Sequence, residues 1–162
     1  MKSRWLVLVL AAALVGCGKS ADMKKLEADL NVEIQKVHEV QMESMKVLDS
    51  LTASLDATMA KHTELAAKYP KALEGHSADD IAAAKEQIAG AKSAMDSWMK
   101  AYKPYDESLP HEQVMAQLNK DMEGLMGMKT QLEAAMKAAS DVVTNHAKAA
   151  DEVMAKYDKK KK

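Results

Sequence analysis

The chain has 162 residues, with 23 Lys and Arg residues against 24 Asp and Glu residues, and a formal net charge of −1 at pH 7. A balance this close to zero predicts no generally basic surface, so we expect no binding to nucleic acid. Cys17 is the only cysteine, which excludes an internal disulfide and a thiolate cluster for a metal.

The first 16 residues have the layout of a secretory signal peptide. Lys2 and Arg4 give the segment a basic start, and an apolar run from Trp5 to Val15 follows. This run is too short to span a bilayer, and small residues close it. The closing sequence, Leu14-Val15-Gly16-Cys17, resembles the lipobox of bacterial lipoproteins.

The lipobox resemblance implies a membrane anchor. In that family the cysteine thiol is diacylated, the signal is cut just before the cysteine, and the new amino group is usually acylated too. Cys17 is then the lipid attachment site, and Leu14, Val15 and Gly16 are the signal-peptidase recognition residues. Several acyl chains give the stable attachment that one chain does not. Gly18 is similar to the pattern that permits release to the outer membrane, so we expect a lipid-anchored protein of the bacterial envelope, on the outer membrane and facing the periplasm.

After the signal peptide, the chain is expected to hold a tether and a helical domain. Small and polar residues predict a lipidated tether over residues 17–23, and the helical domain is expected to span residues 24–158. Its first apolar stripe runs from Leu26 to Tyr69 in steps of three and four, which indicates one long amphipathic helix. Pro70 disfavours helical geometry at the residue before it and ends this helix.

Two further helices are predicted after this break. The Ser77 hydroxyl is placed to cap the second helix. Lys103-Pro104-Tyr105 ends that helix, and Pro110 opens a third helix with an apolar stripe from Val114 to Tyr157. The second helix carries apolar residues at alternating steps of three and four, which is typical of a coiled-coil seam: Ile81, Ala84, Ile88, Ala91, Met95, Trp98 and Tyr102.

The predicted fold is all-α, an elongated antiparallel three-helix bundle of coiled-coil-like character. The first and third helices each cover about 45 residues, or roughly 65 to 70 Å, and the second covers about half of that. The short helix leaves portions of the long helices uncovered, so self-association or a protein partner bound through the helices is expected. A lysine tail over residues 159–162 ends the chain.

Thirteen methionines and five histidines raise the question of a metal site. We interpret the methionines as flexible core residues, because a chain without phenylalanine must fill irregular gaps between helices. His62 and His146 lie on the apolar stripes, where we expect neutral rings bonded to a neighbouring helix, and we expect no cofactor. The alternative is a His/Met metal-binding envelope protein of the copper type. It rests on pairs three or four residues apart: Met42 and Met45, Met59 and His62, Met95 and Met99, and His111 and Met115.

The sequence holds no pattern typical of catalysis. His111-Glu112 is followed by Gln113-Val114-Met115 and not by the second histidine of a zinc protease, and a nucleophile elbow and a phosphate loop are also missing. The carboxylates are interpreted as solvated helix surface, in i,i+4 pairs with lysine. We therefore expect no enzyme and no catalytic residue. The three pairs are Glu64 with Lys68, Glu133 with Lys137, and Glu152 with Lys156.

The segment from Ser97 to Leu118 concentrates aromatic residues, prolines and a histidine. We interpret its aromatics as a cap on the end of the bundle, with a partner surface as the alternative. Trp98-Met99-Lys100-Ala101-Tyr102-Lys103-Pro104, followed by the His-Glu-x-x-Met of residues 111–115 and preceded by another at residues 38–42, resembles uncharacterised small helical lipoproteins of Bacteroidota. The resemblance implies a fold and an envelope address without an activity.

The C-terminus adds a cell-wall hypothesis. The ending from Lys156-Tyr157 to Lys162 is similar to that of the major murein lipoprotein of enteric bacteria, which is joined to peptidoglycan through a terminal lysine. The expected function is a non-enzymatic interaction or spacer module, held on the membrane by its N-terminal acyl chains. The metal-binding protein and a peptidoglycan-linked tether through Lys162 are the alternatives, and a non-specific contact of the lysine tail with the cell wall is a further possibility.

Overall fold

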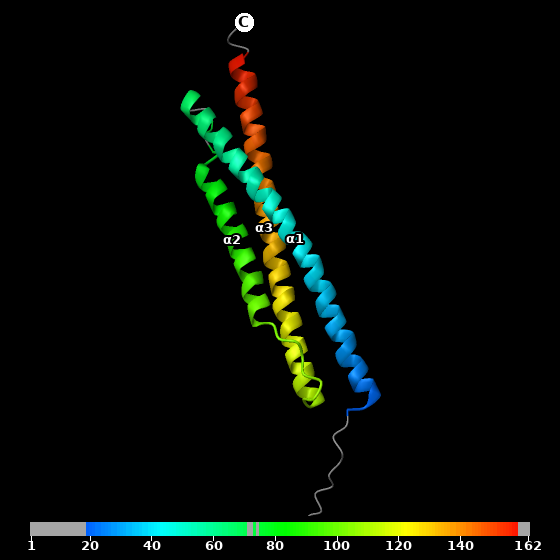
Figure 1. Cartoon of the computed structure of the whole chain (residues 1–162). Helices are drawn as coiled ribbons and strands as arrows, with labels where there is room; N and C mark the ends of the chain where they lie inside the picture. The colour runs from blue at the N-terminus through cyan, green and yellow to red at the C-terminus, as the bar shows by residue number, and fades with distance from the viewer. Residues whose placement is uncertain (1–18, 71–72, 74, 159–162) are drawn as a thin grey trace, which may run out of the picture.

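A computed structural model describes residues 19–70, 73 and 75–158. Those residues form three helices: α1 (Ala21–Lys68), α2 (Ala78–Ala101) and α3 (His111–Asp158) (Figure 1). The described residues are 88% helical and include no strand. The predicted all-α three-helix bundle is therefore confirmed. The signal peptide, Cys17 and the lysine tail lie outside the described residues.

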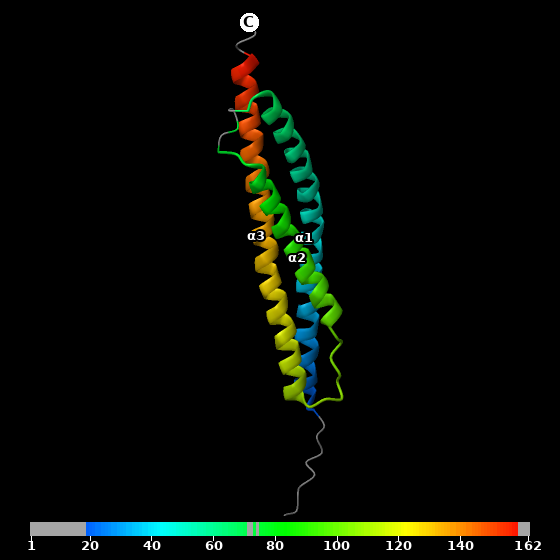
Figure 2. The same cartoon turned by 90° about the vertical axis from the view of Figure 1, so that its left-hand side faces the viewer.

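The bundle is a long rod in which α1 and α3 run in the same direction and α2 runs against both (Figures 1 and 2). α1 and α3 have 48 residues each, and α2 has 24. At 1.5 Å per residue, each outer helix is about 70 Å long. None of the helices in the described ranges is long and apolar enough to cross a membrane.

α1 begins within the segment predicted as tether, so that boundary was wrong by three residues. The Ser20 hydroxyl accepts a hydrogen bond of 3.2 Å from the Met23 backbone N–H, which caps the helix and stabilises its first turn. Asp22 adds a negative charge at the positive end of the helix. The predicted cap of α2 is confirmed, because Ser77 forms a capping box with Asp80.

The buried side of α1 repeats every seven residues. This repeat holds Glu27, Ile34, Gln41, Leu48 and Leu55, which are all at most 2% exposed, and continues with the half-buried His62 and Tyr69. The predicted seam of α2 is confirmed from Ile81 to Met95, and the half-buried Trp98 and Tyr102 continue it. A seven-residue repeat is the pattern of helices packed along a continuous seam.

Three contacts along the seam between α1 and α3 share an offset of 84 residues. Glu27 pairs with His111, Gln41 with Leu125, and the His62 ring with the His146 ring. The intervening α3 positions of this register are buried, namely Leu118, Leu132 and Ala139. The two long helices are therefore packed in parallel, in one register.

The apolar interior is divided into two parts. The main core contains residues from all three helices, from Ile34 and Val114 at one end to Leu55, Ile81 and Ala139 at the other. A smaller satellite core lies toward the C-terminal ends of α1 and α3 and consists of Leu65, Leu73, Ala149, Ala150 and Val153.

The methionines are only in part the core residues we expected. Met95 and Met128 are buried, and five others are partly buried against the main core: Met42, Met45, Met59, Met122 and Met136. Met23, Met99, Met126 and Met154 are at least 37% exposed, which corrects the interpretation for these four. They lie off the buried positions of their helices, where the gap-filling argument does not apply.

Candidate functional site

Three polar clusters interrupt the seam between α1 and α3, one near each end and one between them. The first lies at the end of the rod where α1 and α3 begin, so it is the cluster closest in sequence to Cys17. Glu27 is 1% exposed and is held by two partners. Its Oε2 contacts Lys19 Nζ at 2.8 Å, and its Oε1 contacts His111 Nδ1 at 2.9 Å.

This cluster fixes the start of the described chain to the start of α3. Burial raises the pKa of the Glu27 carboxyl, but the hydrogen bonds and charges of Lys19 and His111 outweigh burial and leave that pKa below its ordinary value. Glu27 therefore stays ionised at neutral pH. We call Lys19, Glu27 and His111 the proximal clasp.

The middle cluster surrounds the end of α2. The Trp98 ring stacks on His38 and Tyr102 at ring-centroid distances of 5.4 and 4.9 Å. Gln35 donates a hydrogen bond of 2.9 Å to the Tyr102 hydroxyl. A Cβ atom added at Gly124 would lie 3.2 Å from Trp98 Cδ1. The lack of a side chain at Gly124 therefore lets the indole ring pack closely against α3.

The Tyr102 hydroxyl also donates a hydrogen bond to Asn31, more than two turns inside α1. The aromatics therefore close the end of α2 and not the end of the bundle, because α1 and α3 both extend beyond them, which corrects the interpretation as an end cap.

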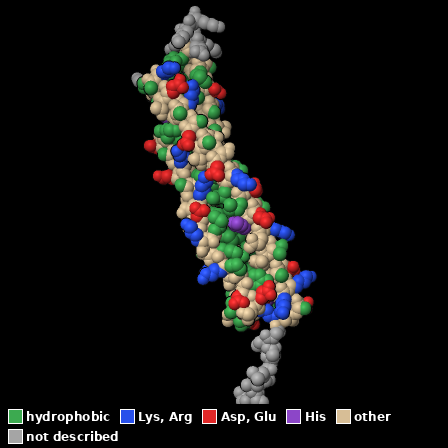
Figure 3. All heavy atoms as spheres, in the orientation of Figure 1, with side chains coloured by type: hydrophobic (Ala, Val, Ile, Leu, Met, Phe, Trp, Pro, Cys, Tyr) green, Lys and Arg blue, Asp and Glu red, His purple; other side chains and the backbone are tan. Residues whose placement is uncertain are grey.

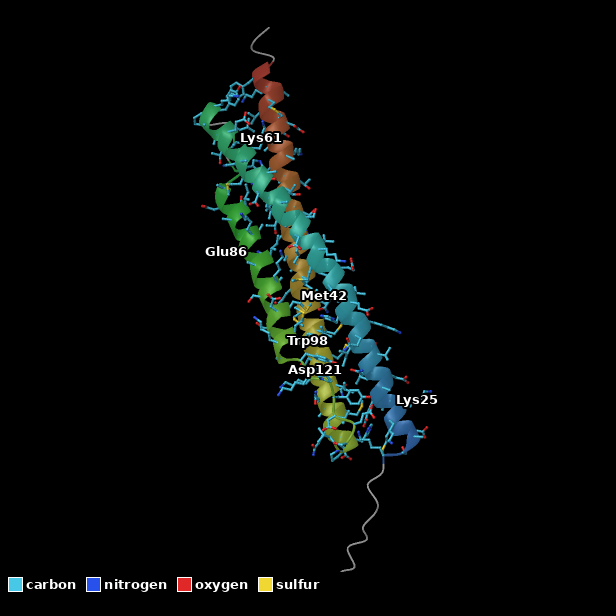
Figure 4. All side chains as sticks on the ribbon, viewed as in Figure 1. Lys25, Met42, Lys61, Glu86, Trp98 and Asp121 are labelled. Carbon is cyan, nitrogen blue, oxygen red and sulfur yellow. The ribbon has the colours of Figure 1, made fainter. Side chains whose placement is uncertain are left out.

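Several polar atoms of the middle cluster have no hydrogen-bond partner. They are His38 Nε2, Gln41 Oε1, Trp98 Nε1 and Asp121 Oδ2. Burial raises the pKa of the Asp121 carboxyl, and the charge of Lys120 opposes this only in part. Trp98 and Asp121 lie at neighbouring levels of the rod, and Met42 lies nearer to the end where α3 finishes (Figure 4). On the face seen in Figure 3, apolar side chains gather in one patch around a histidine.

The third cluster, which we call the histidine layer, contains His62 of α1, His76 of the connection before α2, and His146 of α3. The rings of His62 and His146 are 5.3 Å apart, and those of His76 and His146 are 5.5 Å apart. His146 is 5% exposed. Sequence spacing did not show this convergence, because it depends on the offset between α1 and α3.

The expectation that His62 and His146 bond a neighbouring helix was wrong in part. His62 Nδ1 and His146 Nε2 are shielded from solvent and have no hydrogen-bond partner. The two rings meet each other across the seam, where the apolar neighbours offer no acceptor. Burial lowers the pKa of His146, and the charges of His62 and His76 lower it further, while Asp80 opposes them.

Two cavities flank the histidine layer. One, of about 340 Å³, lies between α1 and α3 and is lined by Lys61, His62, Leu65 and His146 among others. The other, of about 270 Å³, is lined by His76, Asp80, Asn145 and His146 among others. The partnerless nitrogens of His62 and His146 are shielded from these open spaces, so neither cavity presents them to a ligand.

Some of the site residues predicted from sequence lie outside the part of the chain that the structure describes. Leu14, Val15, Gly16, Cys17 and Lys162 lie outside the described residues. In the part of the chain that is described, no three His, Cys, Asp or Glu side chains are arranged to hold a metal ion.

The predicted surface ion pairs are only partly present. The pair of Glu64 with Lys68 is confirmed at 3.4 Å. Glu133 contacts Lys129, and Lys137 contacts Asp141, which corrects the predicted pairing of Glu133 with Lys137. Lys137 has Glu133 four residues before it and Asp141 four residues after it, so the sequence spacing does not select one of these two partners. The predicted pair of Glu152 with Lys156 is not among the ion pairs of residues 75–158.

Comparisons with known proteins add no relative. No protein-family model matches the chain, and no match was found among curated proteins or solved structures.

Proposed function

We propose that this protein is a lipid-anchored, non-enzymatic spacer or interaction module of the bacterial envelope. Acyl chains on Cys17 hold one end at the membrane, and the helical rod carries the other end away from it. The observation that carries the proposal is the position of the two ends. Ala21 and Asp158 lie at opposite ends of the rod (Figure 1), separated by about 70 Å of helix.

The parallel arrangement of α1 and α3 is what supports a spacer. A bundle in which the last helix returned to the start would keep both chain ends at the membrane. Here α2 makes the return, and α3 extends outward again from His111. The C-terminal lysines follow Asp158 directly in sequence, so a group attached to them starts from the distal end.

The proximal clasp supports a close connection between the membrane anchor and the rod. Lys19 is the second residue after Cys17, and its side chain is only 8% exposed where it pairs with Glu27. Only Gly18 separates Lys19 from Cys17 in the sequence, so the connection between the acylated residue and the bundle is short. A short connection limits how far the rod can move relative to its anchor.

A cell-wall tether through Lys162 is the second candidate, and the same distal position favours it. A covalent link at that lysine would join the membrane to peptidoglycan across the length of the rod. The two candidates share the anchor and differ at the C-terminus.

The experiment is the intact mass of protein purified in detergent from native membranes, before and after muramidase digestion. Cleavage before Cys17 with added acyl mass is the expected result for both candidates. A muropeptide on the C-terminal peptide selects the tether, and a free Lys162 selects the spacer alone. An unmodified Cys17 contradicts both.

A further inference from the structure

The histidine layer lies between the two apolar cores. Along α1 the order is Leu55 of the main core, His62, then Leu65 of the satellite core. Along α3 it is Ala139, His146, then Ala149. Each long helix therefore has a histidine between its main-core residues and its satellite-core residues. The two histidines interrupt the apolar seam at the same level of the rod.

The satellite core is the weaker of the two. It has five buried residues, two of them alanines, and neither α2 nor its seam contributes to it. The stacked rings of Tyr69 and Tyr157, 4.1 Å apart, cover its outer end. Because little apolar area is buried here, opening of this end requires less free energy than opening of the main core.

Charged and titratable groups reach the layer from every neighbouring element. His62 and Lys61 come from α1, His76 from the connection, Asp80 from α2, and His146 from α3. Among the described residues of this set, Asp80 is the only acidic side chain, and Lys61 is itself paired with Glu64 at 3.2 Å. Protonation of the imidazoles would place several positive charges around a ring that is almost fully buried, with one carboxylate to balance them.

We propose that the histidine layer is a pH-sensitive joint, at which imidazole protonation in mildly acidic solution opens the satellite core while the main core stays folded. The joint divides the rod into a stable body and a distal tip. The described residues of the tip are 62–70, 73, 75–76 and 146–158. Opening exposes Leu65, Leu73 and Val153, so the apolar surface at the tip becomes available only in the protonated state.

The direction of the pH effect follows from linkage. The pKa of His146 is lower in the folded protein than in an unfolded chain, so the unfolded state binds more protons. The stability of the tip is complete above the unfolded pKa of about 6.5. It is lost as the pH falls from that value through the folded pKa.

Hydrogen exchange read by mass spectrometry tests the proposal on the full mature chain, at pH about 7.5 and about 5, which bracket the ordinary histidine pKa. Rates are corrected for the intrinsic effect of pH. Peptides covering residues 61–69 and 147–157 are expected to lose protection at the lower pH. Uptake of one extra proton on opening changes the opening equilibrium by about tenfold for each pH unit between the unfolded and the folded pKa, and that slope sets the upper limit of the loss. Peptides covering residues 41–55 and 118–135 are expected to keep theirs.

Variants locate the effect in the layer. H146Q and H62Q each remove one imidazole of the layer and are expected to reduce the pH response of the tip. H38Q, at a histidine stacked on Trp98 outside the layer, is the matched control and is expected to keep it. Equal protection of the tip at both pH values in the wild type overturns the proposal. So does an equal loss in body and tip, or an unchanged response in a folded H146Q protein. The comparison of wild-type protection at the two pH values tests the proposal even if a variant fails to fold.

Discussion

Gln41 Nε2 donates a hydrogen bond of 2.7 Å to the carbonyl oxygen of Leu125, which lies 84 positions later in the chain. The proximal clasp joins Glu27 to His111 at the same separation, and the histidine layer joins His62 to His146. Polar groups thus recur along one parallel seam, separated by apolar layers. A buried polar side chain at such a position can fix register at some cost in stability.

Gln41→Leu is expected to raise the free energy of unfolding by about 1 kcal/mol. The amide is 2% exposed, and its Oε1 has no partner, so removing it relieves a buried unsatisfied group. Urea denaturation measures the change. Gln131→Leu, at an exposed position of α3, is the control and is expected to change little. A Gln41→Leu protein less stable than the wild type would show that the amide hydrogen bond outweighs its desolvation.

Glu27→Gln is expected to lower the melting temperature at neutral pH and to reduce its dependence on acid. The pKa of Glu27 is lowered in the folded state, so its contribution is present above the unfolded pKa of about 4.3 and is lost as the pH falls through the folded value. Thermal unfolding between pH 7 and pH 3 measures this. Glu33→Gln, at an exposed carboxylate of the same helix, serves as the comparison. Identical acid profiles for both variants would contradict the clasp.

Alanine substitutions at Gly124 and Gly127, the two glycines inside α3, distinguish the effect of helix propensity on stability from the effect of packing against Trp98. Gly127 has nothing within 4 Å of an added Cβ, so Gly127→Ala is expected to raise the free energy of unfolding by about 1 kcal/mol. Gly124→Ala gains the same propensity but presses on Trp98, so its gain is expected to be smaller or reversed. Urea titration measures both, and tryptophan fluorescence is expected to shift only for Gly124→Ala. Equal gains without a shift would contradict the close approach.

Truncation of a leucine is expected to cost less in the satellite core than in the main core. Leu48 is fully buried in the main core, so Leu48→Ala is expected to lower the free energy of unfolding by about 2 to 5 kcal/mol. Leu65→Ala leaves the main core intact and is expected to cost less in global unfolding, while hydrogen exchange at residues 61–69 accelerates. Equal global costs would show that the two cores unfold as one unit.

The sequence predicted the helices well because local rules determine them. Pro70 and the capping residue Ser77 mark helix boundaries, and the alternating steps from Ile81 to Met95 define the seam of α2. The start of α1 was predicted three residues late because Ser20 was taken as tether when it caps the helix.

The clusters could not be predicted in the same way. Glu27, Gln41 and His62 share a seven-residue repeat that is visible in α1, yet a repeat of polar residues does not reveal its partners. The offset of 84 residues depends on how the two connections between the helices place α3 beside α1. Hydrophobic periodicity alone would also be satisfied if α3 were shifted along α1 by a multiple of seven residues. The meeting of His62 with His146 therefore required the structure.

The most direct test of the proposed spacer measures the distance of each end from the membrane. Fluorophores on Lys24→Cys and Asp158→Cys of the acylated protein are compared in vesicles that carry an acceptor on their lipid headgroups. Acylation of Cys17 leaves the introduced cysteine as the free thiol. Strong energy transfer from position 24 and weak transfer from position 158 is the predicted result. Strong transfer from both positions would mean that the rod lies flat, and transfer from neither would mean that it is not anchored; either result would contradict the spacer.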